Sequence, residues 1–188
     1  MGVLPKLNIE NQVHFVTVNT IEKLNLFTDT KCREVFIQVL DELRNELKYK
    51  LLGYVIMLNH IHLLIQLRVG SDSFEKKRVG SDSFEPNKPE ANSFEPTRSD
   101  ISYVVKRIKG ASARKINTYL KRSGKFWQKG FYDFNIYSEE KFVQKLNYIH
   151  NNPVQAGLIN NPKDWLYPSF QNYYSDNESV IKIDRIEL

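Results

Sequence analysis

The sequence predicts an α+β fold in which helices cover a single antiparallel sheet. Short runs rich in β-branched and aromatic residues predict strands, and longer segments with apolar residues every three or four positions predict helices. The two patterns follow one another in a defined order along the chain. With 188 residues, 41% of them hydrophobic, the chain is long enough for one core and too short for two, so we expect a single domain.

The first two elements are a strand and an amphipathic helix. Residues 12–19, Q-V-H-F-V-T-V-N, predict the strand. Residues 29–49 predict the helix, which begins after the capping candidates Thr28 and Asp29. Its apolar face is made of residues at helical spacing, namely Cys32, Val35, Phe36, Val39, Leu40, Leu43 and Leu47.

Two further strands and a repeat follow. Residues 51–57 and 60–67 are apolar runs of strand length, and the short link Leu58-Asn59 predicts a hairpin. The octapeptide R-V-G-S-D-S-F-E then occurs at residues 68–75 and again at 78–85. This segment is polar, contains prolines and is too short to form a solenoid, so we expect a flexible loop insertion at about 68–98 and assign it no function.

Helical spacing resumes at residues 99–100 and continues to Tyr119, residues 126–137 predict another strand, and Ser138-Glu139-Glu140 opens a last helix. We expect Pro153 to end that helix and a C-terminal tail to begin at about residue 160. The order strand, helix, strand, strand, helix, strand matches a ferredoxin-like βαββαβ unit, with the last helix as an addition.

Positive charge is concentrated in one part of the chain. The net charge is +5, and residues 101–130 contain nine cations and no Asp or Glu. These are Lys106, Arg107, Lys109, Arg114, Lys115, Lys121, Arg122, Lys125 and Lys129. Such a block is typical of a surface that binds a polyanion, and the absence of acids favours nucleic acid over the alternative, a solvated helix face.

Cysteine content and the apolar runs indicate the compartment. Cys32 is the single cysteine, so no internal disulfide is available. No window of the sequence approaches the roughly 18 apolar residues that span a bilayer, and no secretory signal is evident at the start. We expect a soluble cytoplasmic protein that does not bind membranes.

Two of the four histidines lie in the predicted strand 60–67. Side chains two positions apart on a strand project from the same face, so His60 and His62 are expected to stand side by side. Two imidazoles so placed can share a divalent cation. The alternative is a hydrogen-bonded pair on a half-exposed sheet, and a third ligand is needed to decide between them.

The last predicted helix offers a third ligand. Val143, Leu146 and Ile149 form an apolar stripe that is expected to face the core, whereas Tyr148 and Asn152 share a face turned away from most of it. The amide oxygen of Asn152 could bind a metal, and the Tyr148 phenol could point into a site beside the sheet. The alternative for Tyr148 is an ordinary amphipathic surface residue.

Three motifs together resemble a known family. M-L-N-H-I-H-L-L-I at 57–65 resembles the signature of HUH single-tyrosine transposases. F-W-Q-K-G-F-Y-D at 126–133 and Y-I-H-N-N-P-V-Q-A-G-L at 148–158 resemble their REP-associated branch. The resemblance implies that His60, His62 and Asn152 bind Mg²⁺ or Mn²⁺. It also implies that Tyr148 attacks single-stranded DNA, leaving a 5′-phosphotyrosine and a free 3′-OH.

The resemblance implies a partner as well, namely single-stranded or hairpin DNA with palindromic repeats. The basic block would contact phosphates, while Trp127 could stack on an unpaired base or fill the core. A non-catalytic DNA-binding descendant is the main alternative, and an RNA-binding ferredoxin-like module is another. Two features depart from the family: Leu58 stands where the family usually has proline, and the insertion precedes the basic helix. The sequence leaves open the DNA target, a monomer or homodimer, and whether the last helix serves its own site.

Overall fold

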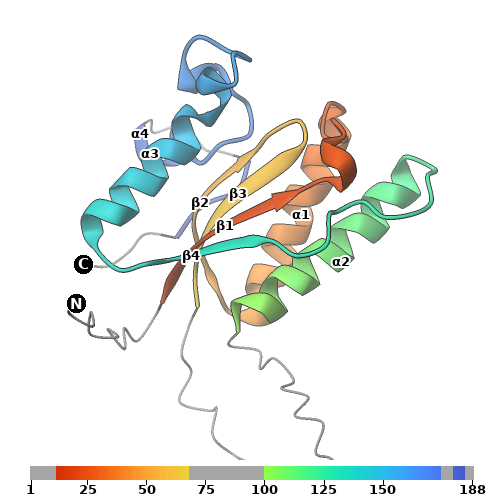
Figure 1. The fold of residues 1–188 in the computed structure, drawn as a ribbon, viewed down its shortest axis with the longest axis horizontal. Helices are drawn as coiled ribbons and strands as arrows, with labels where there is room; N and C mark the ends of the chain where they lie inside the picture. The colour runs from red at the N-terminus through yellow and green to blue at the C-terminus, as the bar shows by residue number, and fades with distance from the viewer. Residues whose placement is uncertain (1–11, 68–99, 175–179, 185–188) are drawn as a thin grey trace, which may run out of the picture.

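The fold is seen in a computed structural model that describes residues 12–67, 100–174 and 180–184 (Figure 1). The repeat insertion predicted at about 68–98 lies outside the described residues. In chain order the elements are β1 (Val13–Asn19), the 3-10 turn η1 (Ile21–Lys23), α1 (Thr30–Leu47), β2 (Lys50–Ile56), β3 (His60–Gln66), α2 (Ile101–Tyr119), β4 (Tyr132–Ile136), α3 (Glu139–Gln155), the 3-10 turn η2 (Pro162–Asp164) and α4 (Phe170–Tyr174).

The four strands form one antiparallel sheet with the order β2-β3-β1-β4. The two central strands are therefore β3 and β1, which are far apart in sequence. Their register places Thr17 opposite His62 and Asn19 opposite His60. The predicted α+β class and its βαββαβ order are confirmed.

Helices cover both faces of the sheet, α1 and α2 one face and α3 the other (Figure 1). Because side chains alternate along a strand, each central strand contributes to two cores. Val16 and Ile61 pack beneath α1 and α2. Phe15 and Leu64 pack on the other face against residues of α3, among them Leu146.

The three long helices begin at residues whose side chains cap a backbone N–H. Asp29 accepts from the Lys31 amide, Asp100 from the Ser102 amide and Ser138 from the Lys141 amide. A capped N–H is one that the helix itself leaves without a partner, so short polar residues fix where a helix starts. Asp29 and Ser138 were recognisable from the sequence for this reason.

Two predicted boundaries are wrong. The predicted strand 126–137 is shorter in the structure and begins at Tyr132, because Phe126 and Trp127 turn into the core. Pro153 does not end the last helix, which continues to Gln155. Proline removes one helical hydrogen bond, to the carbonyl of Ile149, and because Pro153 lies in the last turn the helix loses only this bond before it ends.

A C-terminal tail was expected from about residue 160, and its described residues, up to 174 and from 180 to 184, include several that pack along the outer edge of β2. The Ser169 amide donates to the Tyr54 carbonyl at 2.9 Å, and the Asp184 amide donates to the Leu51 carbonyl at 2.8 Å. The guanidinium of Arg33 lies 5.2 Å from the ring centres of Trp165 and Tyr167. This segment covers an edge that would otherwise be open to other strands.

No helix within the described residues is both long and apolar enough to cross a membrane.

Candidate active site

His60 and His62 project from the face of β3 that α3 covers. Their ring centres are 4.9 Å apart, and His62 is buried while His60 is half-buried. The side-by-side arrangement follows from their spacing of two on a strand. Phe15 of β1 stacks on the His62 ring with a centre distance of 5.3 Å.

Hydrogen bonds orient both imidazoles through Nδ1. The Asn59 Oδ1 atom lies 2.7 Å from Nδ1 of His60, and because an amide oxygen only accepts, that nitrogen carries the proton. Thr17 Oγ1 lies 2.8 Å from Nδ1 of His62. In each ring Nε2 is the nitrogen left for another partner, as in histidines that bind metals through Nε2.

The side chain of Asn152, on α3, contacts the His62 ring. Its Nδ2 lies 3.2 Å from Nε2 of His62, and since an amide nitrogen only donates, Nε2 of His62 accepts. The Nδ1 proton of His62 is then donated to Thr17. The structure therefore brings together the three residues predicted as metal ligands, and Asn152 is only 8% exposed.

Burial keeps the two imidazoles neutral. Burial, followed by the electrostatic effects of the neighbouring His60 and Lys145, lowers the pKa of His62 from its usual 6.5 to about 3. Burial also lowers the pKa of His60, although the hydrogen bond with Asn152 opposes the shift. Metal binding requires unprotonated imidazole, so both rings are in the right state at neutral pH.

These donors fit a divalent cation when the Asn152 amide presents its oxygen instead of its nitrogen. Two imidazole nitrogens and one amide oxygen suit a first-row ion such as Mn²⁺ better than Mg²⁺, which prefers oxygen ligands alone. In the part of the chain that the structure describes, no group of three His, Cys, Asp or Glu side chains could hold a metal. The set of His60, His62 and Asn152 differs from such a group because one of its ligands is an amide.

Tyr148 lies one helical turn before Asn152, beside the histidines. Its ring centre is 5.2 Å from that of His62 and 5.9 Å from that of Phe15. The side chain is 40% exposed, so the phenol can be reached from solvent while its ring rests on the sheet. All four candidate residues of the site come together within one chain.

The predicted face of the last helix requires a correction. Val143 does not face the core but is 46% exposed, whereas Leu146, Ile149 and Asn152 are buried. The sheet therefore meets α3 on a face rotated away from Val143. Tyr148 lies at the border of the buried face rather than opposite to it, and this border position places it next to His62.

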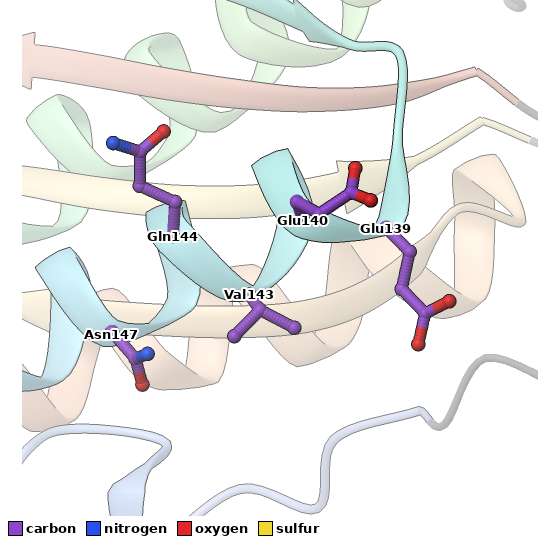
Figure 2. Close-up of a pocket in the computed structure, with 5 residues that line it drawn as sticks. All are labelled: Glu139, Glu140, Val143, Gln144 and Asn147. Atoms are coloured by element: carbon purple, nitrogen blue, oxygen red, sulfur yellow. The ribbon is translucent and has the colours of Figure 1, made fainter.

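A pocket on α3 lies on the side of the helix that bears the exposed Val143 (Figure 2). It has a volume of about 410 Å³ and is lined by residues of α3 alone: Glu139, Glu140, Val143, Gln144 and Asn147. Two carboxylates at its wall disfavour a phosphate. Since it excludes Tyr148, the pocket is not a continuation of the site.

The basic residues predicted to contact DNA divide into two groups. The first lies on α2, which covers the sheet face opposite to the histidines, and several of its cations contact their own chain. Arg107 pairs with Glu46 at 2.7 Å, Lys115 pairs with Glu42 at 2.7 Å, and Lys109 donates to the carbonyl of Gln128 at 2.8 Å. Lys106 and Arg114 are exposed on the same helix.

The second group lies on the loop between α2 and β4, with Lys121, Arg122, Lys125 and Lys129. This loop passes the end of the sheet where β3 begins, because the Gln128 amide donates to the Asn19 carbonyl at 2.9 Å and Asn19 is paired with His60. Lys121, Lys125 and Lys129 are exposed and form no ion pair within the described ranges. The part of the loop that carries Lys125 and Lys129 is thus near the histidine end of the sheet.

Trp127 was a candidate DNA contact with the core as its alternative, and the structure places its ring in the core. Its ring is 6% exposed and packs against Phe27, Phe36 and Phe126, and its Nε1 donates to Ser112 at 3.0 Å. A buried indole whose one donor is satisfied has no free face for a base. We therefore leave Trp127 out of the DNA-binding residues.

Sequence reasoning missed Thr17, Asn59 and Lys145. Asn59 precedes His60 directly and could have been recognised as a partner from that spacing. Lys145 lies three positions before Tyr148 on the helix and could also have been found. Thr17 is brought opposite His62 only by strand pairing, which no local pattern reveals.

Comparisons with known proteins agree with the family resemblance. The family model described as IS200-like transposase matches residues 9–73. A Haemophilus influenzae protein described as a REP-associated tyrosine transposase is 24% identical over 127 residues. The resemblance predicted from the motifs is confirmed. The match covers 65% of this chain and 59% of that relative, which is less than two thirds of the relative's length.

One solved transposase structure is similar to this chain in fold. A REP-associated tyrosine transposase bound to a REP hairpin superposes with a TM-score of 0.63 at 17% identity, covering 99% of both chains. A structure from Deinococcus radiodurans described as a transposase gives a TM-score of 0.46 at 18% identity, covering 80% of this chain and 97% of that one. The IS200-like match includes His60 and His62 but ends before Tyr148.

Proposed function

We propose that this chain is a metal-dependent DNA transposase that cleaves and rejoins single-stranded DNA beside a hairpin, through a 5′-phosphotyrosine. The observation that carries the proposal is the placement of the Tyr148 ring 5.2 Å from His62, which itself contacts Asn152. A nucleophile beside three possible metal ligands, two neutral imidazoles and an amide, fits phosphoryl transfer assisted by a divalent cation.

The reaction exchanges one phosphate ester for another. The Tyr148 oxygen forms a bond to phosphorus, the bond from phosphorus to the 3′ oxygen breaks, and the electron pair leaves with that oxygen. The phenol loses one proton to solvent and the new 3′-hydroxyl gains one. Because a phosphate ester replaces a phosphate ester, the reverse attack by a 3′-hydroxyl rejoins DNA without an external energy source.

Residues of the chain would bind the metal ion, orient its imidazole ligands and position the nucleophile. His60, His62 and Asn152 would bind Mg²⁺ or Mn²⁺, and such an ion would polarise the scissile phosphate. Thr17 and Asn59 fix the two imidazoles so that each presents Nε2. Helix α3 holds Tyr148 one turn from Asn152, which aligns nucleophile and metal ligand on one rigid element.

The proposed DNA surface combines the loop and helix cations: Lys106, Arg107, Lys109, Arg114, Lys115, Lys121, Arg122, Lys125 and Lys129. The relative in fold was solved with a REP hairpin, which supports hairpin DNA as the partner. The pairs Arg107–Glu46 and Lys115–Glu42 are exposed, and exposed pairs contribute little stability, so DNA phosphates can compete for these cations.

A covalent adduct tests the proposal directly. The DNA would be a single-stranded oligonucleotide from the region flanking the chain's own gene, incubated with Mn²⁺. The native chain should form an adduct that survives denaturation, and Tyr148→Phe should form none while keeping its DNA affinity. Tyr137→Phe, at an exposed tyrosine away from the histidines, should react normally.

An adduct in Tyr148→Phe would assign the nucleophile to another residue. If the native chain binds this DNA and forms no adduct, it is a non-catalytic DNA-binding protein and the proposed reaction is wrong.

A further inference from the structure

Lys145 lies on α3 one turn before Tyr148, with its ammonium group over a set of aromatic rings. Nζ is 4.6 Å from the ring centre of Phe15, 4.8 Å from that of Phe134 and 6.0 Å from that of Tyr148. The three rings come from β1, β4 and α3. The side chain is half-buried, so its position is determined by packing and not by solvent alone.

This cation has no acidic partner among the residues that the structure describes. The carboxylate on β4, Asp133, points to the opposite face of the sheet and pairs there with His14 at 3.0 Å. On α3 itself, Glu139 and Glu140 lie on the outer side of the helix (Figure 2). Aromatic rings attract a cation without neutralising it, so Lys145 presents a full positive charge toward the face that bears Tyr148.

That charge lies close to the histidine end of the site. The Phe15 ring separates the two groups, with its centre 4.6 Å from Lys145 Nζ and 5.3 Å from the His62 ring centre. A phosphate attacked by Tyr148 must lie against the phenol oxygen. The His62 ring centre lies 5.2 Å and the Lys145 Nζ atom 6.0 Å from the centre of the Tyr148 ring, so both groups are near a phosphate placed there.

We propose that Lys145 is a further catalytic residue, which contacts a non-bridging oxygen of the scissile phosphate and stabilises the negative charge that grows there during attack. This inference rests on the proposed function, since it assumes that Tyr148 is the nucleophile. The side chain contributes a fixed charge and transfers no proton. Such a preorganised charge acts mainly on the transition state, so its loss should lower the rate more than the affinity.

Three variants test the role of the charge. Lys145→Met keeps the length of the side chain and removes the charge, and Lys145→Arg keeps the charge. Lys141→Met is the matched control, because Lys141 lies one turn earlier on α3 and donates to Gln144 at 2.9 Å, away from the site. The rate of adduct formation is measured in a single turnover with saturating oligonucleotide and Mn²⁺, and folding is checked by thermal unfolding.

Lys145→Met should slow the adduct about 100-fold with DNA affinity changed less than about threefold. Lys145→Arg should recover most of the rate, and Lys141→Met should match the native chain. An equal loss of the adduct-formation rate in Lys145→Met and Lys145→Arg would assign the effect to packing and overturn the proposal. A native rate of adduct formation in Lys145→Met would also overturn it.

A second measurement does not depend on cleavage. Inorganic phosphate is added to the native chain with Mg²⁺ while the side-chain resonances of its lysines are followed by NMR. The Lys145 resonance should shift and the Lys141 resonance should not, even if the native chain forms no adduct and the proposed function fails. An unchanged Lys145 resonance would show that no phosphate binds at this position.

Discussion

Asn152 donates its side-chain amide to His62 across 90 positions of sequence, with 3.2 Å between the two nitrogens. This bond joins the central strand β3 to α3, and it lies where the proposed cation would bind. A cation must replace the amide N–H as the partner of the His62 Nε2 atom. Metal binding and the position of Asn152 are therefore coupled.

The first prediction concerns the metal. Calorimetry should show one site that binds Mn²⁺ more tightly than Mg²⁺, because two of its three ligands are imidazoles. His62→Ala should abolish binding, and Thr17→Val, which removes the partner of Nδ1, should weaken it by about tenfold. His14→Asn is the control, since His14 pairs with Asp133 on the opposite face. Native affinity in His62→Ala would place the metal elsewhere.

The second prediction concerns the salt dependence of DNA binding. Replacing Lys121, Lys125 and Lys129 by Gln should reduce the log-log slope of affinity against salt by about 0.7 per lost contact on single strands. Lys163→Gln is the control, because it alters an exposed lysine outside the basic surface. Replacement of Arg107 should change the slope less, since Arg107 must first leave Glu46. An unaltered slope in the triple variant would exclude the loop as a phosphate contact.

The third prediction concerns the packing of α3 on the sheet. A Cβ atom at Gly53 would lie 3.0 Å from Cδ1 of Leu146 and 3.2 Å from Cδ1 of Leu64. Gly53→Ala should therefore lower the free energy of unfolding by about 1 kcal/mol or more and slow adduct formation by displacing α3. Gly110→Ala is the matched control.

Gly110 lies inside α2 with nothing within 4 Å of an added Cβ, so its change to alanine should stabilise the chain by about 0.5–1 kcal/mol. Urea unfolding measures both variants. Equal stability of Gly53→Ala and the native chain would show that the packing of α3 does not depend on its close approach to Gly53.

The fourth prediction concerns pH. Burial lowers the pKa of His150 from 6.5 to about 4, and its Nε2 contacts Ser169 at 3.0 Å. Between these two values the unfolded chain binds the proton and the folded chain does not. The stabilisation of the folded chain that depends on neutral His150 is therefore complete above pH 6.5. It is lost as the pH falls toward 4, by about 1.4 kcal/mol per pH unit.

His150→Gln removes this group and keeps an amide for Ser169. Measured without metal between pH 6.5 and 5, its free energy of unfolding should fall less steeply with decreasing pH than that of the native chain. Parallel curves would show that His150 titrates alike in both states.

Local patterns in the sequence determined the helices and strands and the reactive side chains that they carry. Apolar spacing and the caps Asp29 and Ser138 define the helices, and a spacing of two places His60 and His62 on one face whatever the strand packs against. The motifs then indicated the role of Tyr148 by resemblance. None of these inferences requires knowledge of which elements touch.

Tertiary structure alone decided which residues meet. The direction in which α3 faces the sheet, with Val143 outside and Asn152 over His62, depends on how whole side-chain surfaces fit and not on the helix itself. The same holds for Trp127, whose burial depends on Phe27 and Phe36 of distant elements. Strand register likewise placed Thr17 against His62. Such contacts join residues far apart in the chain, so they are fixed by packing, which a pattern read over one helix or strand does not contain.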